Sequence, residues 1–123
     1  MASSKVSFDT VREIGLAFPG VKETMAYGMP ALKIRRELLA CIPASRSVEP
    51  HSLVVRISLQ DRAELLAADP AVYYLTDHYE SFDGVLVRLS RITPDGLQGL
   101  LGMAYKYVTR AGQRSPAYKR KTR

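Results

Sequence analysis

The chain has 123 residues, 46% of them hydrophobic and 24% charged, which is the balance of a single globular domain. Its one cysteine, Cys41, excludes an internal disulfide and a zinc site built from several cysteines, and its apolar neighbours predict a buried, inert thiol. The N-terminus lacks the apolar run of a secretion signal, and no apolar run approaches the ~20 residues of a membrane span. We therefore expect a cytoplasmic protein.

The positive charge is unevenly distributed along the chain. The formal net charge is +6, from 18 basic and 12 acidic residues. Six of the basic residues and none of the acidic ones lie in residues 110–123, so residues 1–109 are formally neutral. We predict one domain over residues 1–109, followed by a basic, flexible tail over residues 110–123.

The first predicted element is a helix over residues 7–18. Ser7 can cap this helix, and apolar residues recur at helical spacing until Pro19 and Gly20 end it. Residues 21–30 show no clear periodicity, so a connector is expected there.

Residues 31–42 predict two strands, because apolar and charged residues alternate along the first of them. The tip of this hairpin falls at Arg36 and Glu37. Neither residue favours the positive φ of a tight two-residue turn, so we expect a looser connection. Residues 43–52 contain two prolines and no periodicity, which predicts a loop.

The second half of the chain predicts two further strand-to-helix units. A strand over residues 53–59 leads into a helix capped by Ser58, and a short strand over residues 72–75 precedes a turn-rich connection. A long strand over residues 84–92 then leads into a helix that begins at Thr93. This last helix carries several glycines, which close packing on the sheet would explain.

Two strand segments are near copies of each other, Val55-Arg56-Ile57-Ser58 and Val87-Arg88-Leu89-Ser90. Period-two alternation generates such matches by itself, and it places Arg56 and Arg88 on the face opposite the apolar core residues. The elements follow the order α-β-β-β-α-β-β-α. This order predicts an α+β fold, a two-layer sandwich in which helices flank an antiparallel sheet of about five strands.

Three segments resemble the MmcQ/YjbR family of small bacterial proteins. They are SFDTVREIGLAFPGV, YGMPALKI and, most specifically, YYLTDHYESFDGVLVRLSRITPDGLQGLLGMAYKYV, and together they span residues 7–109. The resemblance implies an α+β fold related in architecture to secretion chaperones, and DNA binding through a double-wing surface. The hairpin tip here lacks the glycine often seen in the family, and the loop over residues 43–52 is longer.

The first functional hypothesis is nucleic-acid binding without catalysis. Basic side chains on the first predicted hairpin, the following loop, two strands and the tail could contact phosphates, which supply most non-specific affinity. These candidates are Lys33, Arg35, Arg36, Arg46, Arg56, Arg88, Lys119, Arg120, Lys121 and Arg123.

Two other hypotheses stay open. A sheet with an accessible edge could bind a protein or peptide partner. A small-ligand pocket could form from Tyr27, Met29, Asp77, His78 and Tyr79, although His78 could equally serve a structural role through a hydrogen bond to the backbone. No nucleophile–base set, glycine-rich phosphate loop or paired-histidine metal motif is present in the sequence, so we expect no enzyme activity, metal or cofactor.

Overall fold

The structure is a computed structural model that describes the backbone of residues 6–44 and 47–121 and the side chains up to residue 110. Its strands come in runs between the helices, as the α+β prediction requires. Their order is α1 (Phe8–Leu16), β1 (Val21–Ala26), β2 (Met29–Ile34), β3 (Glu37–Cys41), β4 (Ser52–Arg56), α2 (Leu59–Ala68), β5 (Tyr73–Tyr74), the 3-10 helix η2 (Asp77–Tyr79), β6 (Gly84–Arg88) and α3 (Pro94–Lys121).

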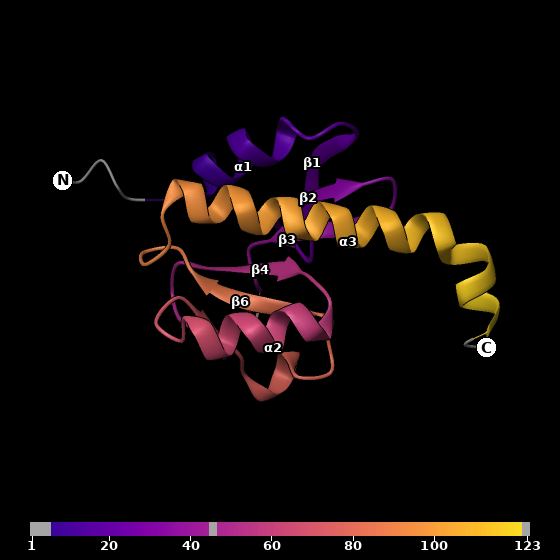
Figure 1. The fold of residues 1–123 in the computed structure, drawn as a ribbon. Helices are drawn as coiled ribbons and strands as arrows, with labels where there is room; N and C mark the ends of the chain where they lie inside the picture. The colour runs from indigo at the N-terminus through magenta and orange to yellow at the C-terminus, as the bar shows by residue number, and fades with distance from the viewer. Residues whose placement is uncertain (1–5, 45–46, 122–123) are drawn as a thin grey trace.

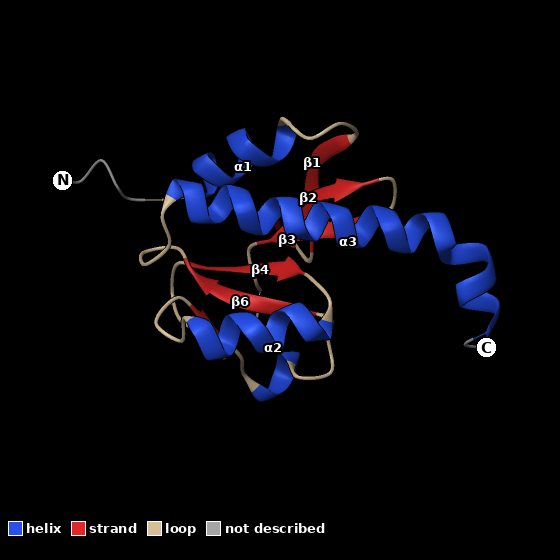
Figure 2. Ribbon diagram, in the orientation of Figure 1, coloured by secondary structure: helices blue, strands red, loops and turns tan. Residues whose placement is uncertain are grey.

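The strands form one open sheet in the order β1-β2-β3-β4-β6-β5, and every neighbouring pair is antiparallel. The three α-helices lie on the same face of this sheet (Figures 1 and 2). α1 packs over β1 and β2, α3 crosses β3 and β4, and α2 packs over β5 and β6. The predicted two-layer α+β sandwich is therefore confirmed.

The sheet has six strands, one more than the sequence predicted, because residues 21–26 form β1 and not a connector. β1 is an edge strand whose central residues are all exposed, so its sequence lacks the apolar alternation that marks a half-buried strand. A two-residue turn joins it to β2, with Tyr27 at φ 54° and Gly28 at φ 79°. Positive φ at both positions is the geometry that matches the twist of two antiparallel strands.

The prediction of a loose turn after β2 is wrong. Ile34 pairs with Glu37, so Arg35 and Arg36 alone form the turn, and Arg35 has a φ of 59°. A left-handed backbone costs a non-glycine residue about 1–2 kcal/mol. Burial of Ile34 on the helix-covered face fixes the register of the hairpin and holds the turn in this conformation.

Alternation along β4 and β6 matches the prediction and gives each face of the sheet its own apolar cluster. The core under the helices contains alternate residues of these strands, such as Val55 and Val87. The residues between them, Val54 and Leu86, join Ala31 and Cys41 in a smaller cluster on the opposite face. Burial raises the pKa of the Cys41 thiol to about 11, so the thiol is protonated at neutral pH and a poor nucleophile.

Two of the glycines of α3, Gly99 and Gly102, do not have the close contacts that were expected. A Cβ atom at Gly99 would meet no other atom within 4 Å, and one at Gly102 would meet only the ring of Phe18, at 3.8 Å. The predicted explanation, packing against the sheet, is therefore wrong for these two positions. α3 extends to Lys121, and the predicted flexibility of residues 110–123 stays a prediction. Among residues 6–44 and 47–121, no helix has the length and apolar character needed to cross a membrane.

Candidate nucleic-acid interface

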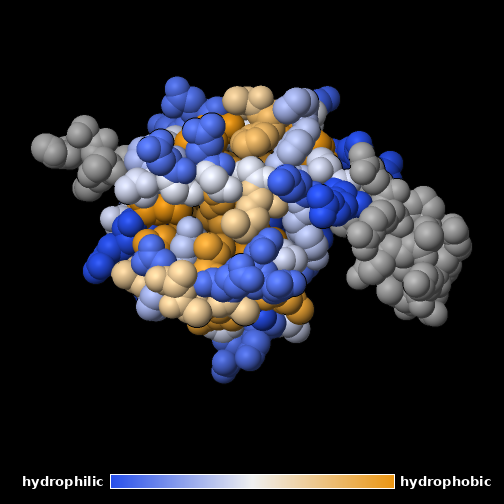
Figure 3. Space-filling view, in the orientation of Figure 1, coloured by the Kyte–Doolittle hydropathy of each residue, from blue (hydrophilic) through white to orange (hydrophobic). Residues whose placement is uncertain are grey.

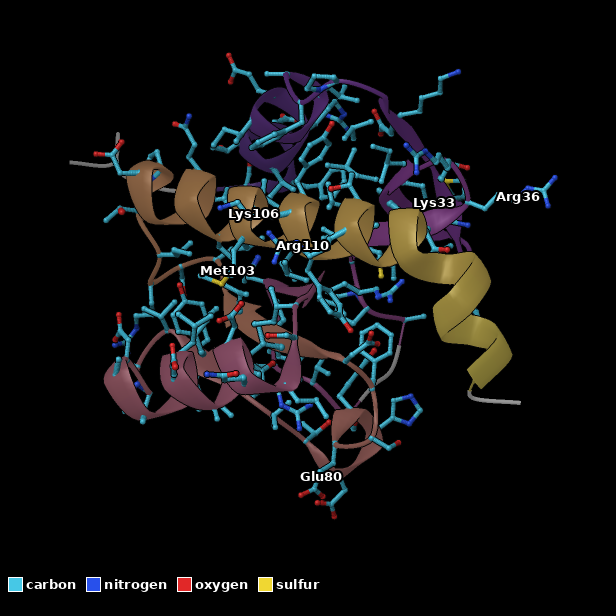
Figure 4. The ribbon with its side chains drawn as sticks, turned by 45° about the vertical axis from the view of Figure 1, so that its right-hand side comes forward. Lys33, Arg36, Glu80, Met103, Lys106 and Arg110 are labelled. Atoms are coloured by element: carbon cyan, nitrogen blue, oxygen red, sulfur yellow. The ribbon has the colours of Figure 1, made fainter. Side chains whose placement is uncertain are left out.

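The hairpin formed by β2 and β3 presents a group of basic side chains. Arg35 and Arg36 form its exposed tip, and Lys33 lies two residues before the tip on β2. Lys22 of the neighbouring β1 stands directly opposite Lys33, which the sequence analysis did not foresee. Arg36 projects outward from the molecule, and Lys33 lies beside it (Figure 4). We call Lys22, Lys33, Arg35 and Arg36 the basic hairpin.

The carboxylates nearest to the basic hairpin along the chain, Glu23 and Glu37, form ion pairs with other residues, Arg12 and Arg56. Within residues 6–44 and 47–110, none of the four side chains of the basic hairpin forms an ion pair. Directly opposed like charges such as Lys22 and Lys33 destabilise an antiparallel pair of strands. Arg12 of α1 shows the contrast, since its guanidinium donates to both Asp9 and Glu23. The basic hairpin is thus available to an anionic partner from outside the chain.

Arg56 lies at the end of β4 and is occupied within the protein. Its guanidinium donates to Glu37 at 3.1 Å and to Asp83 at 2.9 Å, and it lies over the ring of Tyr107. The Tyr107 hydroxyl donates to Asp83 as well, at 2.7 Å. Burial and this hydrogen bond raise the pKa of Tyr107 to about 12. Arg56 therefore ties β3 and the start of β6 to α3.

Arg88 occupies the same place in Val87-Arg88-Leu89-Ser90 as Arg56 does in Val55-Arg56-Ile57-Ser58. It binds the loop before β4 through Glu49. It donates to both carboxylate oxygens of Glu49 at 2.8 Å and lies 4.4 Å from the centre of the Tyr74 ring. It also donates to the carbonyls of Pro70 and Ala71. The hydrogen bond from Arg88 holds the pKa of Glu49 below its ordinary value. These contacts bind the Arg88 guanidinium to groups of the protein itself, and its predicted role as a phosphate contact stays untested.

The other basic candidates lie outside the described side chains. Arg46 and Arg123 fall outside the described residues, and Lys119, Arg120 and Lys121 belong to the part of α3 whose backbone alone is described. Arg110 is the last cation of α3 with a described side chain, and it is exposed.

The residues of the predicted ligand pocket are brought together only in part. Tyr79 packs into the small cluster on the helix-free face, and its pKa is raised by burial and by its neighbours Cys41, Tyr74 and Tyr27. Tyr27 itself is 91% exposed. His78 and Asp77 are exposed, and the His78 ring contacts Tyr79 edge to face at 4.9 Å. The hydrogen bonds of the described residues include none to the His78 ring, and the choice between a structural and a ligand-facing His78 stays open.

One important residue was missed by the sequence analysis. Arg62 of α2 donates to the carbonyls of Glu80, Phe82 and Gly84, at 3.1, 2.8 and 3.3 Å, and so holds the connection between η2 and β6. A single arginine on a short helix gives no signal of this role in the sequence. No group of three or more histidine, cysteine, aspartate or glutamate side chains that could hold a metal occurs in the part of the chain that the structure describes.

Comparison with known proteins relates the chain to uncharacterised ones. No family model matches it. It is 30% identical over 87 residues to uncharacterised proteins of Mycobacterium bovis and Mycobacterium tuberculosis, a match that covers 68% of this chain and 65% of each relative.

A solved structure is similar over most of the chain. It is the crystal structure of Deinococcus radiodurans protein DR2400, which carries the DUF419 domain. The TM-score is 0.71 at 21% identity, over 88% of this chain and 82% of that chain. The resemblance found in the sequence is thereby confirmed at the level of the fold: this chain has the fold of the DUF419 domain, the domain of the MmcQ/YjbR family.

Proposed function

We propose that this protein binds nucleic acid, with double-stranded DNA as the first candidate, through the basic hairpin. The observation that carries the proposal is the presence of four cations on adjacent strands and their turn, with no ion pair to any described carboxylate. Unpaired cations at such spacing favour contacts to successive phosphates, which give affinity without sequence preference.

The shape of the hairpin supports the same proposal. β2 and β3 lie between β1 and β4 in the sheet, so DNA can approach this hairpin at its turn and not around a free ribbon. The tight turn places Arg35 and Arg36 at the exposed end of the two strands. The last turns of α3, which carry Arg110 and the basic residues beyond it, lie on the same side of the molecule as this hairpin (Figures 1 and 4).

The ion pairs of Arg56 and Arg88 reduce the set of residues that we propose as phosphate contacts. The guanidinium groups of Arg56 and Arg88 already bind two carboxylates and one carboxylate, respectively. A phosphate would have to displace these partners, whereas it meets no such competition at Lys33 and Arg36. We therefore assign phosphate contacts to the hairpin and a structural role to the two paired arginines.

The experiment is a fluorescence-anisotropy titration of short duplex DNA with the full chain at several salt concentrations. Replacing Lys33 and Arg36 together with alanine should weaken binding by tenfold or more. It should also lower the slope of log affinity against log salt by about two, since each lost phosphate contact removes ~0.9.

A double variant that removes two cations outside the hairpin, Arg12→Ala with Arg91→Ala, is the matched control because it changes net charge equally. The control should retain most of the affinity. Equal losses in the two double variants would show that only overall charge matters, and the hairpin proposal would then fail.

A further inference from the structure

A second candidate site lies on the opposite, helix-covered face of the protein, in a groove between α2 and α3. The groove has a volume of about 580 Å³. Ser58 and Asp61, at the start of α2, line one wall. The other wall and the floor come from a single stripe of α3 that runs from Gly99 to Arg110. Figure 3 shows hydrophobic residues between the two helices, bordered by hydrophilic residues.

The floor of the groove is exposed helix backbone. Gly99 and Gly102 line it, and the space above Gly99 is open, since a Cβ atom there would have no neighbour within 4 Å. Each glycine in a helix interior costs about 1 kcal/mol relative to alanine. Side chains at these positions would fit the fold but would fill the groove. The glycines thus keep open a space that the packing of the protein does not require.

The far end of the groove is basic. Lys106 and Arg110 are four residues apart on α3, and both side chains are exposed. Figure 4 shows them on the side of α3 that faces α2, together with Met103. Like charges at this spacing repel each other. Neither side chain forms an ion pair within the described part of the chain, although Asp61 lines the same groove.

The rest of the lining is apolar or fixed in position. Met103 supplies a flexible thioether, and Tyr107 supplies an aromatic ring whose hydroxyl is held by Asp83 at 2.7 Å. A flat floor, an apolar wall and a pair of cations at one end suit a molecule with a compact apolar body and a single anionic group. The volume is within the range of about 300–1,000 Å³ that is typical of small-molecule pockets.

We infer that the groove between α2 and α3 binds a small organic anion, with its apolar body over Gly99, Gly102 and Met103 and its phosphate or carboxylate at Lys106 and Arg110. Asp61 and Ser58 on the facing wall can accept hydrogen bonds from hydroxyl or amino groups of the body. This site shares no residue with the basic hairpin, so either proposal can fail without the other.

The test is an NMR titration of the full, ¹⁵N-labelled chain with phenyl phosphate, benzoate and benzyl alcohol. The two anions distinguish a phosphate site from a carboxylate site, and the neutral alcohol reports the contribution of the apolar body. At least one anion should shift the backbone amides of residues 99–110 and bind tenfold or more tightly than benzyl alcohol. Inability of both anions to shift these amides at millimolar concentration would overturn the inference.

Three variants locate the site. Gly99→Leu should abolish binding while the melting temperature stays the same or rises, because the new side chain fills the groove but improves helix propensity. Lys106→Gln with Arg110→Gln should reduce affinity at least tenfold. The control, Arg12→Gln with Arg91→Gln, removes equal charge outside both proposed sites and should bind normally. Normal binding by Gly99→Leu, or equal losses in the two glutamine pairs, would contradict a built site in the groove.

Discussion

At the scale of one residue, Arg35 holds its charged side chain at the hairpin turn with a left-handed backbone. Its φ of 59° is unfavourable for any residue with a Cβ atom, yet the register of the hairpin requires it. Arg35→Gly should therefore keep or raise the free energy of unfolding, by up to about 1 kcal/mol, because relief of strain outweighs the greater freedom of glycine in the unfolded chain.

Arg36→Gly provides the matched control for this prediction. The backbone at Arg36 does not have a positive φ, so glycine there should lower the free energy of unfolding by about 0.5–1 kcal/mol. Both variants lose one cation and should lose similar DNA affinity. Urea denaturation of the pair checks the stability prediction. A lower stability for Arg35→Gly than for Arg36→Gly would contradict the account of the turn.

Glu49 gives a pH-dependent prediction at the same scale. Its pKa in the folded protein is lowered by the hydrogen bonds from Arg88, so its carboxylate stabilises the fold fully above the ordinary pKa of a glutamate, near 4.5. This stabilisation is lost as the pH falls from there through the lowered folded value. The melting temperature of Glu49→Gln should therefore fall less on acidification from pH 6 to pH 3 than that of the unchanged chain. If the melting temperatures of Glu49→Gln and of the unchanged chain fell by the same amount, the stabilising role of the Glu49–Arg88 pair would be contradicted.

At the scale of elements, the connection between η2 and β6 depends on α2. Arg62 reaches from α2 to the carbonyls of Glu80, Phe82 and Gly84, so its loss removes the hydrogen bonds that hold this connection. Arg62→Met should lower the free energy of unfolding by about 1–3 kcal/mol and speed amide hydrogen exchange in residues 79–84. Glu64→Met, an exposed change on the same helix, is the control and should leave both unchanged. Protection of residues 79–84 that survives in Arg62→Met would rule out this anchoring role.

The same scale shows what the sequence could and could not predict. β4 and β6 were predictable because both of their faces are buried, which gives each strand an apolar run that ends at Arg56 or Arg88. β1 was not, because an exposed edge strand carries no such pattern. Lys33, Arg35 and Arg36 of the basic hairpin were found because they are close in sequence. Lys22 was not, because only the pairing of β1 with β2 brings it opposite Lys33. The partners of Arg56 were not, since Glu37 and Asp83 lie 19 and 27 residues away and only the pairing of strands brings them together.

At the scale of the whole molecule, the helices cover one face of the sheet. The cations of the sheet fall into two groups, those with an ion pair inside the protein and those without one among the described residues. The arginines at the ends of β4 and β6 stabilise loops, whereas the cations of the basic hairpin stay without a carboxylate partner in the described residues. Residues 1–109 are formally neutral, so their overall charge cannot attract DNA. In the function that we propose, the attraction within these residues comes from the placement of the basic hairpin.

The most direct test of DNA binding by the basic hairpin is an NMR titration of the full chain with a short DNA duplex at physiological salt. We predict that the largest shifts occur at the amides of Lys22, Lys33, Arg35 and Arg36. These shifts should disappear when Lys33 and Arg36 are replaced with alanine. Shifts confined to α3 beyond Arg110, with the hairpin amides unmoved, would contradict it and leave the charge of the C-terminal segment as the source of binding.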